Sequence, residues 1–181
     1  GLTIPASGEL VVLGNKVPHW SSRTAIGSGI ARIPEDRHKT GTIADFNLTE
    51  NAVLEGYFRE GFSKNGWMDW KAAEGFATDI IAKYDVRCPG PSARTRLLSG
   101  GNMQKLILGR ALLREDGQTP SLVVAHQPTW GLDVGAVNFV QEQLIAVRDA
   151  GAAVLLISDD LDEILELADQ IAVMHAGELT P

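Results

Sequence analysis

The stretch that decides the fold is Leu98-Ser99-Gly100-Gly101-Asn102-Met103-Gln104-Lys105, continued by Leu106-Ile107-Leu108-Gly109-Arg110-Ala111-Leu112-Leu113. Apolar residues recur at helical spacing from Met103 onward, and Ser99 with two glycines stands just ahead of the first turn. Such a helix start offers free backbone N–H groups and a favourable dipole, and glycines let phosphates approach the backbone. The pattern indicates an anion site, although an ordinary serine N-cap is the simpler explanation of the tetrapeptide alone.

The following segment favours the anion site. Residues 121–125 are an apolar run of strand length, which ends in His126-Gln127-Pro128-Thr129-Trp130-Gly131-Leu132-Asp133-Val134-Gly135-Ala136. A glycine-led helix, a buried strand and Pro-Thr-x-Gly-Leu-Asp in this order resemble the nucleotide-binding domains of ABC transporters. In that resemblance residues 98–101 match the signature motif, residues 123–127 the Walker B strand, and residues 131–133 the D-loop.

The resemblance covers nearly the whole chain and extends to one branch of the family. Ile33-Pro34-Glu35-Asp36-Arg37 resembles the Q-loop region, with Glu35 at the position of the usual glutamine that contacts Mg²⁺. Without the family context, a solvated charged loop is the preferred interpretation of this segment. Asn102-Met103-Gln104-Lys105 and residues 131–136 are similar to the simple-sugar and nucleoside importers. In that branch two such domains lie in tandem, and this chain is most similar to the second.

Composition limits the remaining possibilities. The 181 residues form one domain, or one domain with a subdomain, and a 44% hydrophobic content supplies a core. The net charge of −7 without a Lys/Arg cluster argues against nucleic acid as a partner. The single cysteine, Cys88, cannot form an internal disulfide, which fits a reducing cytoplasm. Residues 152–157, the most apolar stretch, are too short to cross a bilayer, so we expect membrane attachment only through partner subunits.

Helices and strands are expected to alternate in the second half of the chain. Helical patterns cover residues 137–150 and 162–168, and strand patterns cover residues 121–125, 152–157 and 171–175. This alternation predicts a parallel α/β core, and the resemblance implies a P-loop NTPase-like ABC ATPase domain. No Gly-x-x-x-x-Gly-Lys-Ser/Thr occurs, so Walker A is absent and we expect a fragment incomplete at its N-terminal side. A sheet left incomplete in this way would have an exposed edge.

The resemblance divides the chain into three parts. Residues 1–45 would belong to the ATPase core sheet and Q-loop region, residues 46–115 to a helical signature subdomain, and residues 116–181 to the core with the Walker B, D-loop and H-loop positions. Within the first two parts we expect a short strand in residues 8–16 closed by a Gly-Asn turn. Helices are expected from residue 49, capped by Asn47 or Thr49, and over residues 69–84, with a loop at residues 62–67.

Three positions depart from the chemistry of ATP hydrolysis. His126 stands where the family has the aspartate that ends Walker B, and imidazole is a poor ligand for Mg²⁺, a hard cation that prefers oxygen. A buried polar residue is the alternative interpretation of His126. Gln127 replaces the catalytic glutamate and cannot accept a proton, a loss that typically costs on the order of 10²- to 10⁴-fold in rate. Asp159 replaces the switch histidine and brings a negative charge near a γ-phosphate. We therefore expect no ATP hydrolysis by this chain alone.

Ser99, Gly100, Gly101, Asn102 and Asp133 agree with the family or its importer branch. Since ATP in the family lies between one domain's P-loop and the other domain's signature helix, the resemblance implies a composite site for ATP and Mg²⁺. The implied partners are the first ATPase domain of the same polypeptide, transmembrane permease subunits and, indirectly, a substrate-binding protein. The implied location is the cytoplasmic face of the membrane. A cytoplasmic ABC-type ATPase that acts away from membranes and a nucleotide-free scaffold domain remain as alternatives.

Overall fold

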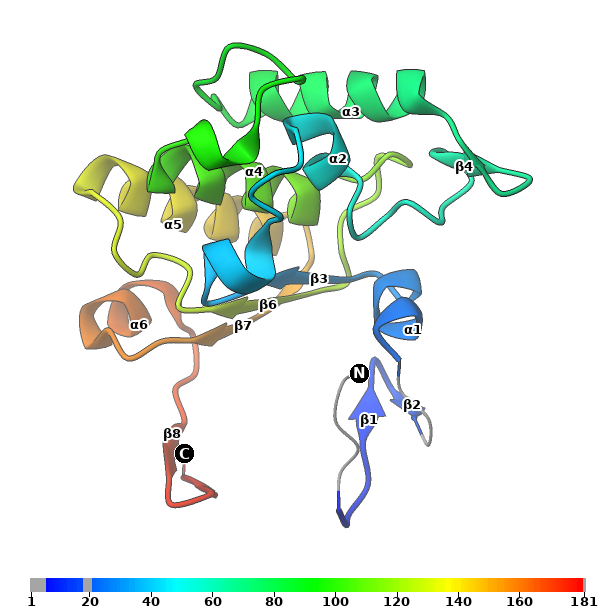
Figure 1. Cartoon of the computed structure of the whole chain (residues 1–181). Coiled ribbons are helices and arrows are strands. Elements are labelled where there is room, and N and C mark those ends of the chain that lie inside the picture. The colour runs from blue at the N-terminus through cyan, green and yellow to red at the C-terminus, as the bar shows by residue number, and fades with distance from the viewer. Residues whose placement is uncertain (1–5, 18–20, 181) are drawn as a thin grey trace.

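The structure, a computed structural model, describes residues 6–17 and 21–180, and its centre is a three-stranded parallel sheet (Figure 1). Strands β3 (Ile30–Ile33), β6 (Leu122–His126) and β7 (Ala153–Ile157) lie in the order β3-β6-β7. In the parallel register of β6 and β7, His126 pairs with Ile157. A helix connects β6 to β7, as a parallel pair requires. The predicted α/β core is therefore confirmed.

Capping side chains fix where the helices begin. Asn47 and Ser99 cap the helices at the predicted positions, and Asn47 forms a full capping box with Glu50. Asp133 also caps a helix, which explains why that helix starts before residue 137, where the apolar periodicity begins. The helices are α1 (Ser22–Gly27), α2 (Leu48–Ala52), α3 (Trp70–Lys83), α4 (Gly100–Leu112), α5 (Val134–Asp149) and α6 (Leu161–Leu167), with a π-helical turn at Arg37–Gly41 and a 3₁₀ turn at Thr95–Leu97.

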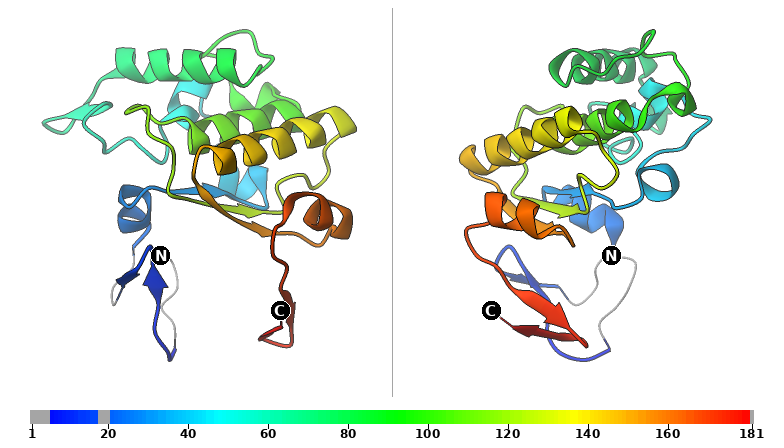
Figure 2. Two further views of the ribbon diagram at one scale, coloured as in Figure 1. Left: turned by 180° about the vertical axis from the view of Figure 1, so that it is seen from behind. Right: turned by 90° about the vertical axis from the view of Figure 1, so that its left-hand side faces the viewer.

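Helices α2 to α5 lie on one side of the sheet, as Figures 1 and 2 show from three directions. Val123 and Ala125 of β6 are fully buried and belong to one apolar cluster with residues of α4. On β7, by contrast, Leu155 and Ile157 are 52% and 45% exposed. The alternation along each strand thus separates a packed face from an open one.

The strand expected in residues 171–175, with its turn at Ala176 and Gly177, is present from Val173 to His175, but its expected place in the parallel core was wrong. Residues 171–175 do not extend the sheet, because the turn at Ala176 and Gly177, both at positive φ, folds β8 (Val173–His175) back onto β9 (Glu178–Thr180). The third parallel strand is instead β3. Its short pattern, interrupted by the exposed Arg32, gives little strand signal on its own.

Two further short hairpins also turn at residues with positive φ. Asn65 and Gly66, at φ of 52° and 82°, close β4 (Ser63–Lys64) onto β5 (Trp67–Met68), where a loop was expected. Near the N-terminus β1 (Val11–Val12) pairs with β2 (Asn15–Lys16). The turn there is Leu13-Gly14 instead of the expected Gly-Asn, and Asn15 already belongs to β2.

Helix α4 is the centre of the packed side. Its residues Leu106, Ile107 and Leu108 are at most 1% exposed, and they share one apolar cluster with the sheet and α3. The proposed boundaries at 1–45, 46–115 and 116–181 stay a prediction, and the core of the described residues is continuous across them.

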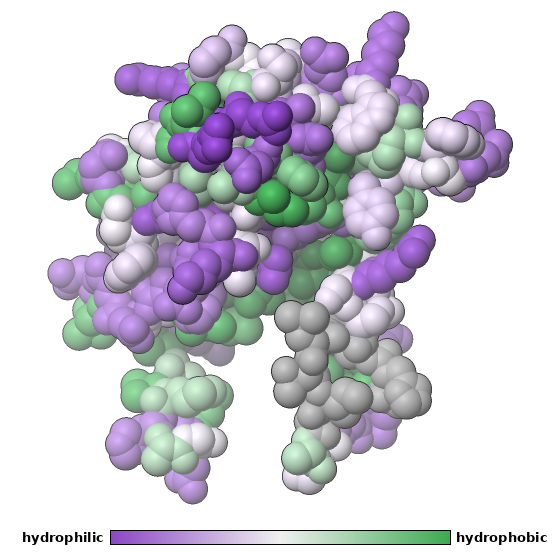
Figure 3. Space-filling model, viewed as in Figure 1, coloured by the Kyte–Doolittle hydropathy of each residue, from purple (hydrophilic) through white to green (hydrophobic). Residues whose placement is uncertain are grey.

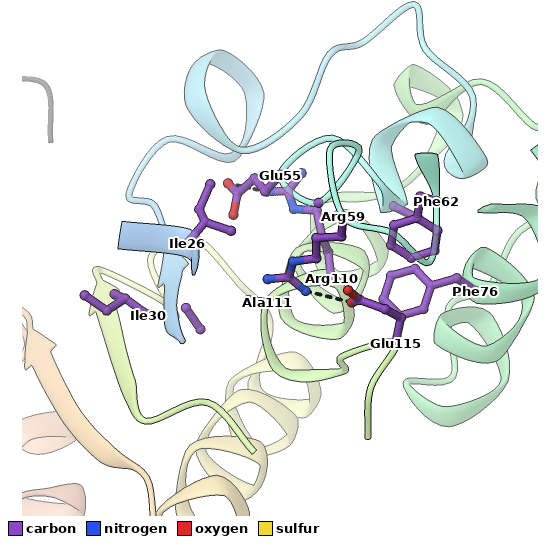
Figure 4. A pocket seen from close by; sticks show the side chains of 12 residues that line it. Ile26, Ile30, Glu55, Arg59, Phe62, Phe76, Arg110, Ala111 and Glu115 are labelled. Atoms are coloured by element: carbon purple, nitrogen blue, oxygen red, sulfur yellow. Dashed lines mark hydrogen bonds and ion pairs between the residues drawn. The ribbon is translucent and has the colours of Figure 1, made fainter. Parts of the chain in front are cut away.

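Ion pairs connect α4 to the sheet around a small cavity of about 30 Å³ (Figure 4). Glu55 accepts hydrogen bonds from Arg110 of α4 at 3.3 Å and from Arg32 of β3 at 3.0 Å. Nearby, Arg59 donates to Glu115 at 2.7 Å. Burial lowers the pKa of Arg110, and the charge of Glu55 opposes this shift.

Within the described residues, no helix combines the length and the apolar character needed to cross a membrane.

Candidate functional site

The predicted anion site at the start of α4 has the geometry of a capped helix N-terminus. Ser99 lies at φ −66° and ψ 160°, and its Oγ accepts hydrogen bonds from the backbone N of Asn102 at 3.4 Å and from Asn102 Nδ2 at 2.9 Å. Ser99 is exposed, while Gly100, Gly101 and Asn102 are half-buried. The first N–H groups of an α-helix have no partner inside the helix, so this end can donate to an anion.

The start of α5 lies against this end. A Cβ at Gly101 would stand 3.3 Å from Cβ of Ala136 and 3.8 Å from Oδ2 of Asp133. Asp133 caps α5, because its Oδ1 accepts from the backbone N of Ala136 at 3.0 Å. Ser99 and Asp133, which the sequence placed in two separate motifs, are therefore the caps of two helix starts in contact with each other.

Arg37 holds the two motifs together and was not singled out from the sequence. Its Nη2 donates to the carbonyl of Trp130 at 2.7 Å, and Cβ atoms at Gly100 and Gly131 would lie 3.7 Å and 3.3 Å from its guanidinium. The side chain is buried, which lowers the pKa of Arg37, while the Asp36 carboxylate opposes that shift. In the sequence Arg37 stands in a charged hexapeptide, and nothing there separates a buried arginine from solvated neighbours.

Gln104 makes a second connection that the sequence did not reveal. It is 2% exposed, and its Nε2 donates to the carbonyl of Pro128 at 2.7 Å. The amide of Gln104 thereby fixes the loop after β6 against α4. A polar residue on the buried face of a predicted helix is the one signal that could have identified it.

Glu35 and His126 lie together at the ends of β3 and β6. His126 Nδ1 is 3.6 Å from Glu35 Oε2, and the two side chains are 43% and 58% exposed. The contact becomes an ion pair only when the imidazole carries a proton. The exposure of His126 rules out the alternative that it is a buried polar residue.

Gln127 and Asp159 line the same open cleft, of about 640 Å³, beside Trp130 and Gly131, the residue with which the predicted D-loop begins. Gln127 has a φ of +48°, its backbone N donates to the carbonyl of Ile157 at 2.8 Å, and its carbonyl accepts from the backbone N of Trp130 at 3.2 Å. These bonds hold a left-handed backbone conformation that is unfavourable for a residue with a side chain. Two backbone hydrogen bonds thus fix the conformation of Gln127, although its side-chain amide cannot act as a base.

In the part of the chain that the structure describes, no three His, Cys, Asp or Glu side chains are arranged to hold a metal ion. Glu35, His126 and Asp159 do not form such a group, and the start of α4 has backbone N–H groups that can donate to an anion.

Comparison with known proteins gives the chain's relationships. No family model matches it. It is 43% identical over 179 residues to the guanosine import ATP-binding protein NupO of Bacillus subtilis, a match that covers 99% of this chain and 34% of NupO. It is 38% identical over 181 residues to the glucose import ATP-binding protein TsgD13 of Haloferax volcanii, covering 99% of this chain and 32% of that protein. The chain thus spans about a third of the length of these curated relatives.

A solved structure agrees with the fold. It is an ATP-binding cassette described as a dimer in a post-hydrolysis state bound to ADP and Pi, with a TM-score of 0.69 and 21% identity. The superposition covers 90% of this chain and 67% of that one. The chain is therefore a homologue of nucleoside and sugar import ATP-binding proteins, and its fold is that of an ABC ATPase domain.

Proposed function

We propose that this chain supplies the start of α4 to a composite ATP site whose P-loop and catalytic base belong to a partner ATPase domain. The single observation that carries the proposal is the exposed, Ser99-capped helix start with Gly100 and Gly101 in its first turn, packed beside Asp133. The parent protein would be the ATP-binding component of an importer for nucleosides or simple sugars, as its relatives are named.

The chemistry of the helix start supports this role. A 13-residue helix places about half a positive charge at its N-terminus, and two residues without Cβ leave its N–H groups accessible. The Ser99 hydroxyl and the first-turn N–H groups would donate to the γ-phosphate of an ATP held by the partner. Bound Mg²⁺ and ATP would bring the phosphoryl chemistry, and this chain would stabilise the charge that develops on the phosphate oxygens.

The chain's own half-site would not hydrolyse ATP. Gln127 offers an amide where a base is required, and Asp159 adds a carboxylate beside it in the same cleft. The imidazole of His126 lies 3.6 Å from Glu35, and among the described residues it belongs to no group of three potential metal ligands. This asymmetry would leave hydrolysis to the site to which α4 contributes.

The remaining partners follow from the same relationship. A tandem first ATPase domain would carry the P-loop, permease subunits would hold the pair at the cytoplasmic face of the membrane, and a substrate-binding protein would act through the permease. The charge of −7 remains unfavourable for binding nucleic acid.

The experiment is a titration of the isolated partner ATPase domain with this chain while ATP hydrolysis is followed. We expect concentration-dependent stimulation by the unaltered chain and by Gln127→Asn, since asparagine tolerates the left-handed backbone and Gln127 has no role in the partner's site. Ser99→Arg should abolish the stimulation, because a bulky cation at the helix start blocks the phosphate.

A matched control is Ser92→Arg, which adds the same side chain at another exposed serine. Absence of stimulation by the unaltered chain, with a folded and ATP-bound partner, would favour the scaffold alternative. Equal stimulation by Ser99→Arg and Ser92→Arg would also contradict the composite site.

A further inference from the structure

The cleft beside Gln127 has an unusually acidic lining. We use the name acidic cleft for the space between the D-loop, α5 and α6. Its carboxylates are Asp159, Asp160, Asp162, Glu163 and Glu166. None of its lining residues is Lys, Arg or His. A phosphate would meet repulsion here, and a cation would meet attraction.

Glu163 is the feature that points to a ligand. It is 3% exposed, and neither Oε1 nor Oε2 has a hydrogen-bond partner among the described residues. Other acids of the cleft are engaged: Asp160 caps α6, and Glu166 accepts from Gln141 Nε2 at 3.2 Å. A buried carboxylate without a partner is costly, which indicates that a donor from outside completes it.

Trp130 adds an apolar surface to the same cleft. The residue stands directly before the predicted D-loop, and its side chain lines the cleft and is 69% exposed. An exposed indole face beside carboxylates suits a flat cation that can stack on the ring and donate to oxygen at the same time. A guanidinium group has this shape, whereas a metal ion would need a cluster of ligands that the described residues do not form.

We propose that the acidic cleft docks an arginine side chain of a partner polypeptide, with its guanidinium stacked on Trp130 and hydrogen-bonded to Glu163. Charge complementarity and the unpartnered carboxylate identify the occupant as a basic protein segment. The chain's own half-site then serves as a protein-binding site in place of a nucleotide-binding one. This inference is independent of the composite ATP site at α4, which lies at the start of a different helix.

The test uses the full chain and two probe peptides of identical length. One peptide contains three arginines separated by glycine and serine, and in the other three citrullines replace the arginines, which removes the charge and keeps the shape. We expect the arginine peptide to quench the tryptophan fluorescence of the chain on binding, the quenching to be lost in Trp130→Phe and to weaken with added salt, and the citrulline peptide to give no response. Binding of both peptides with equal affinity, or of neither, would overturn the proposal.

Glu163→Gln supplies the decisive variant, because it has opposite effects on stability and on binding. We expect at least a tenfold loss of affinity for the arginine peptide, together with a higher melting temperature of the free chain, since an unpartnered buried charge is removed. A purely structural role of Glu163 would change the melting temperature without this loss of affinity. The control Glu142→Gln removes one exposed charge from α5 outside the cleft and should change the affinity less than about twofold.

Two results would reject the docking site. One is unchanged peptide affinity in a folded Glu163→Gln chain. The other is Mg²⁺, tested alone in the same fluorescence titration, binding in a manner that depends on Glu163 and excludes the peptide. Neither result touches the stimulation of a partner's ATP hydrolysis, so failure of this inference is distinguishable from failure of the proposed function.

Discussion

At the residue scale, the degree of burial of a polar side chain separates those that hold the motifs in place from those that can contact other molecules. Arg37, Gln104 and Glu163 are each at most 9% exposed, and the first two have defined hydrogen-bond partners. Ser99 and Asp133 are exposed and act through the helix starts that they cap. The buried polar groups thus fix the positions of the motifs, and the exposed ones face other molecules.

Tyr84 provides a prediction about pH. Burial raises the pKa of Tyr84 to about 12. In the unfolded chain a tyrosine ionises near about pH 10, so the contribution of Tyr84 to stability is fully present below that pH and is lost as the pH rises towards about 12. An absorbance titration of the folded chain at the tyrosinate wavelength should show a component at this high pH. Tyr84→Phe should remove it, and an unchanged titration curve would contradict the assignment.

At the scale of elements, the contact between α3 and α4 depends on a glycine. A Cβ at Gly109 of α4 would lie 2.4 Å from Cγ2 of Ile80 and 3.1 Å from Cδ2 of Tyr84, both at the C-terminal end of α3. Real Cβ atoms do not approach neighbours so closely. Helices α3 and α4 can therefore pack at this distance only because residue 109 has no side chain.

Gly109→Ala should therefore destabilise the chain by about 1 to 3 kcal/mol, because α3 and α4 must move apart. Chemical denaturation measures the change. Gly75→Ala is the matched control, since no atom lies within 4 Å of a Cβ at Gly75, in the middle of α3. This control should stabilise the chain by about 0.5 to 1 kcal/mol. The opposite signs of the two substitutions are the test, and equal effects would mean that helix propensity alone decides both.

The ion pairs between α4 and β3 give a third prediction. The Arg110 side chain is 2% exposed and depends on Glu55 for its charged partner. Glu55→Gln should destabilise the chain by about 3 to 5 kcal/mol, because it leaves a buried charge uncompensated. Asp45→Asn breaks the exposed pair with Arg96, whose side chains are 79% and 62% exposed, and should cost less than about 1 kcal/mol. Similar losses of denaturation free energy in both variants would contradict this distinction.

The elements also show what the sequence could predict. Helices α3, α4 and α5 have caps and apolar periodicity within one segment, so their positions were predicted to within a few residues. Strand β3 has no such local signal. Among the hairpin segments, residues 8–16 and 171–175 were predicted to contain strands, whereas β4 and β5 were expected to be a loop. β3 becomes a strand by pairing with β6, where Ile33 lies in register with Ala125, 92 residues further along the chain, a partnership that no local pattern contains.

The residues of the candidate site also fall into two groups, those with a local sequence signal and those without one. Ser99 and Asp133 were found because they belong to motifs and cap helices, which are local features. Arg37, Gln104 and Glu163 were missed because burial and the lack of a partner depend on distant segments. Contacts between motifs therefore had to come from the structure.

At the scale of the whole molecule, the packing is one-sided. Helices cover one face of the sheet, and the β1–β2 and β8–β9 hairpins project below the other (Figures 1 and 2). In the space-filling view, apolar surface in green follows the lower margin of the body above these hairpins (Figure 3). The start of α4 and the acidic cleft are separate sites on this one body, and they differ in the charge that they attract.

The measurement that tests the central claim most directly is the steady-state ATPase rate of the complete protein that contains this chain, with Ser99 replaced by Thr or by Asp. Both residues cap helices, so both variants should retain α4. Threonine keeps the hydroxyl, whereas aspartate brings a negative charge to the place proposed for the γ-phosphate.

If α4 completes the ATP site, Ser99→Thr should retain a rate close to that of the unaltered protein, and Ser99→Asp should lose at least about 100-fold. Circular dichroism and thermal melting of both variants check that each is folded. Equal, undiminished rates in two folded variants would contradict the claim that the start of α4 contacts the phosphate.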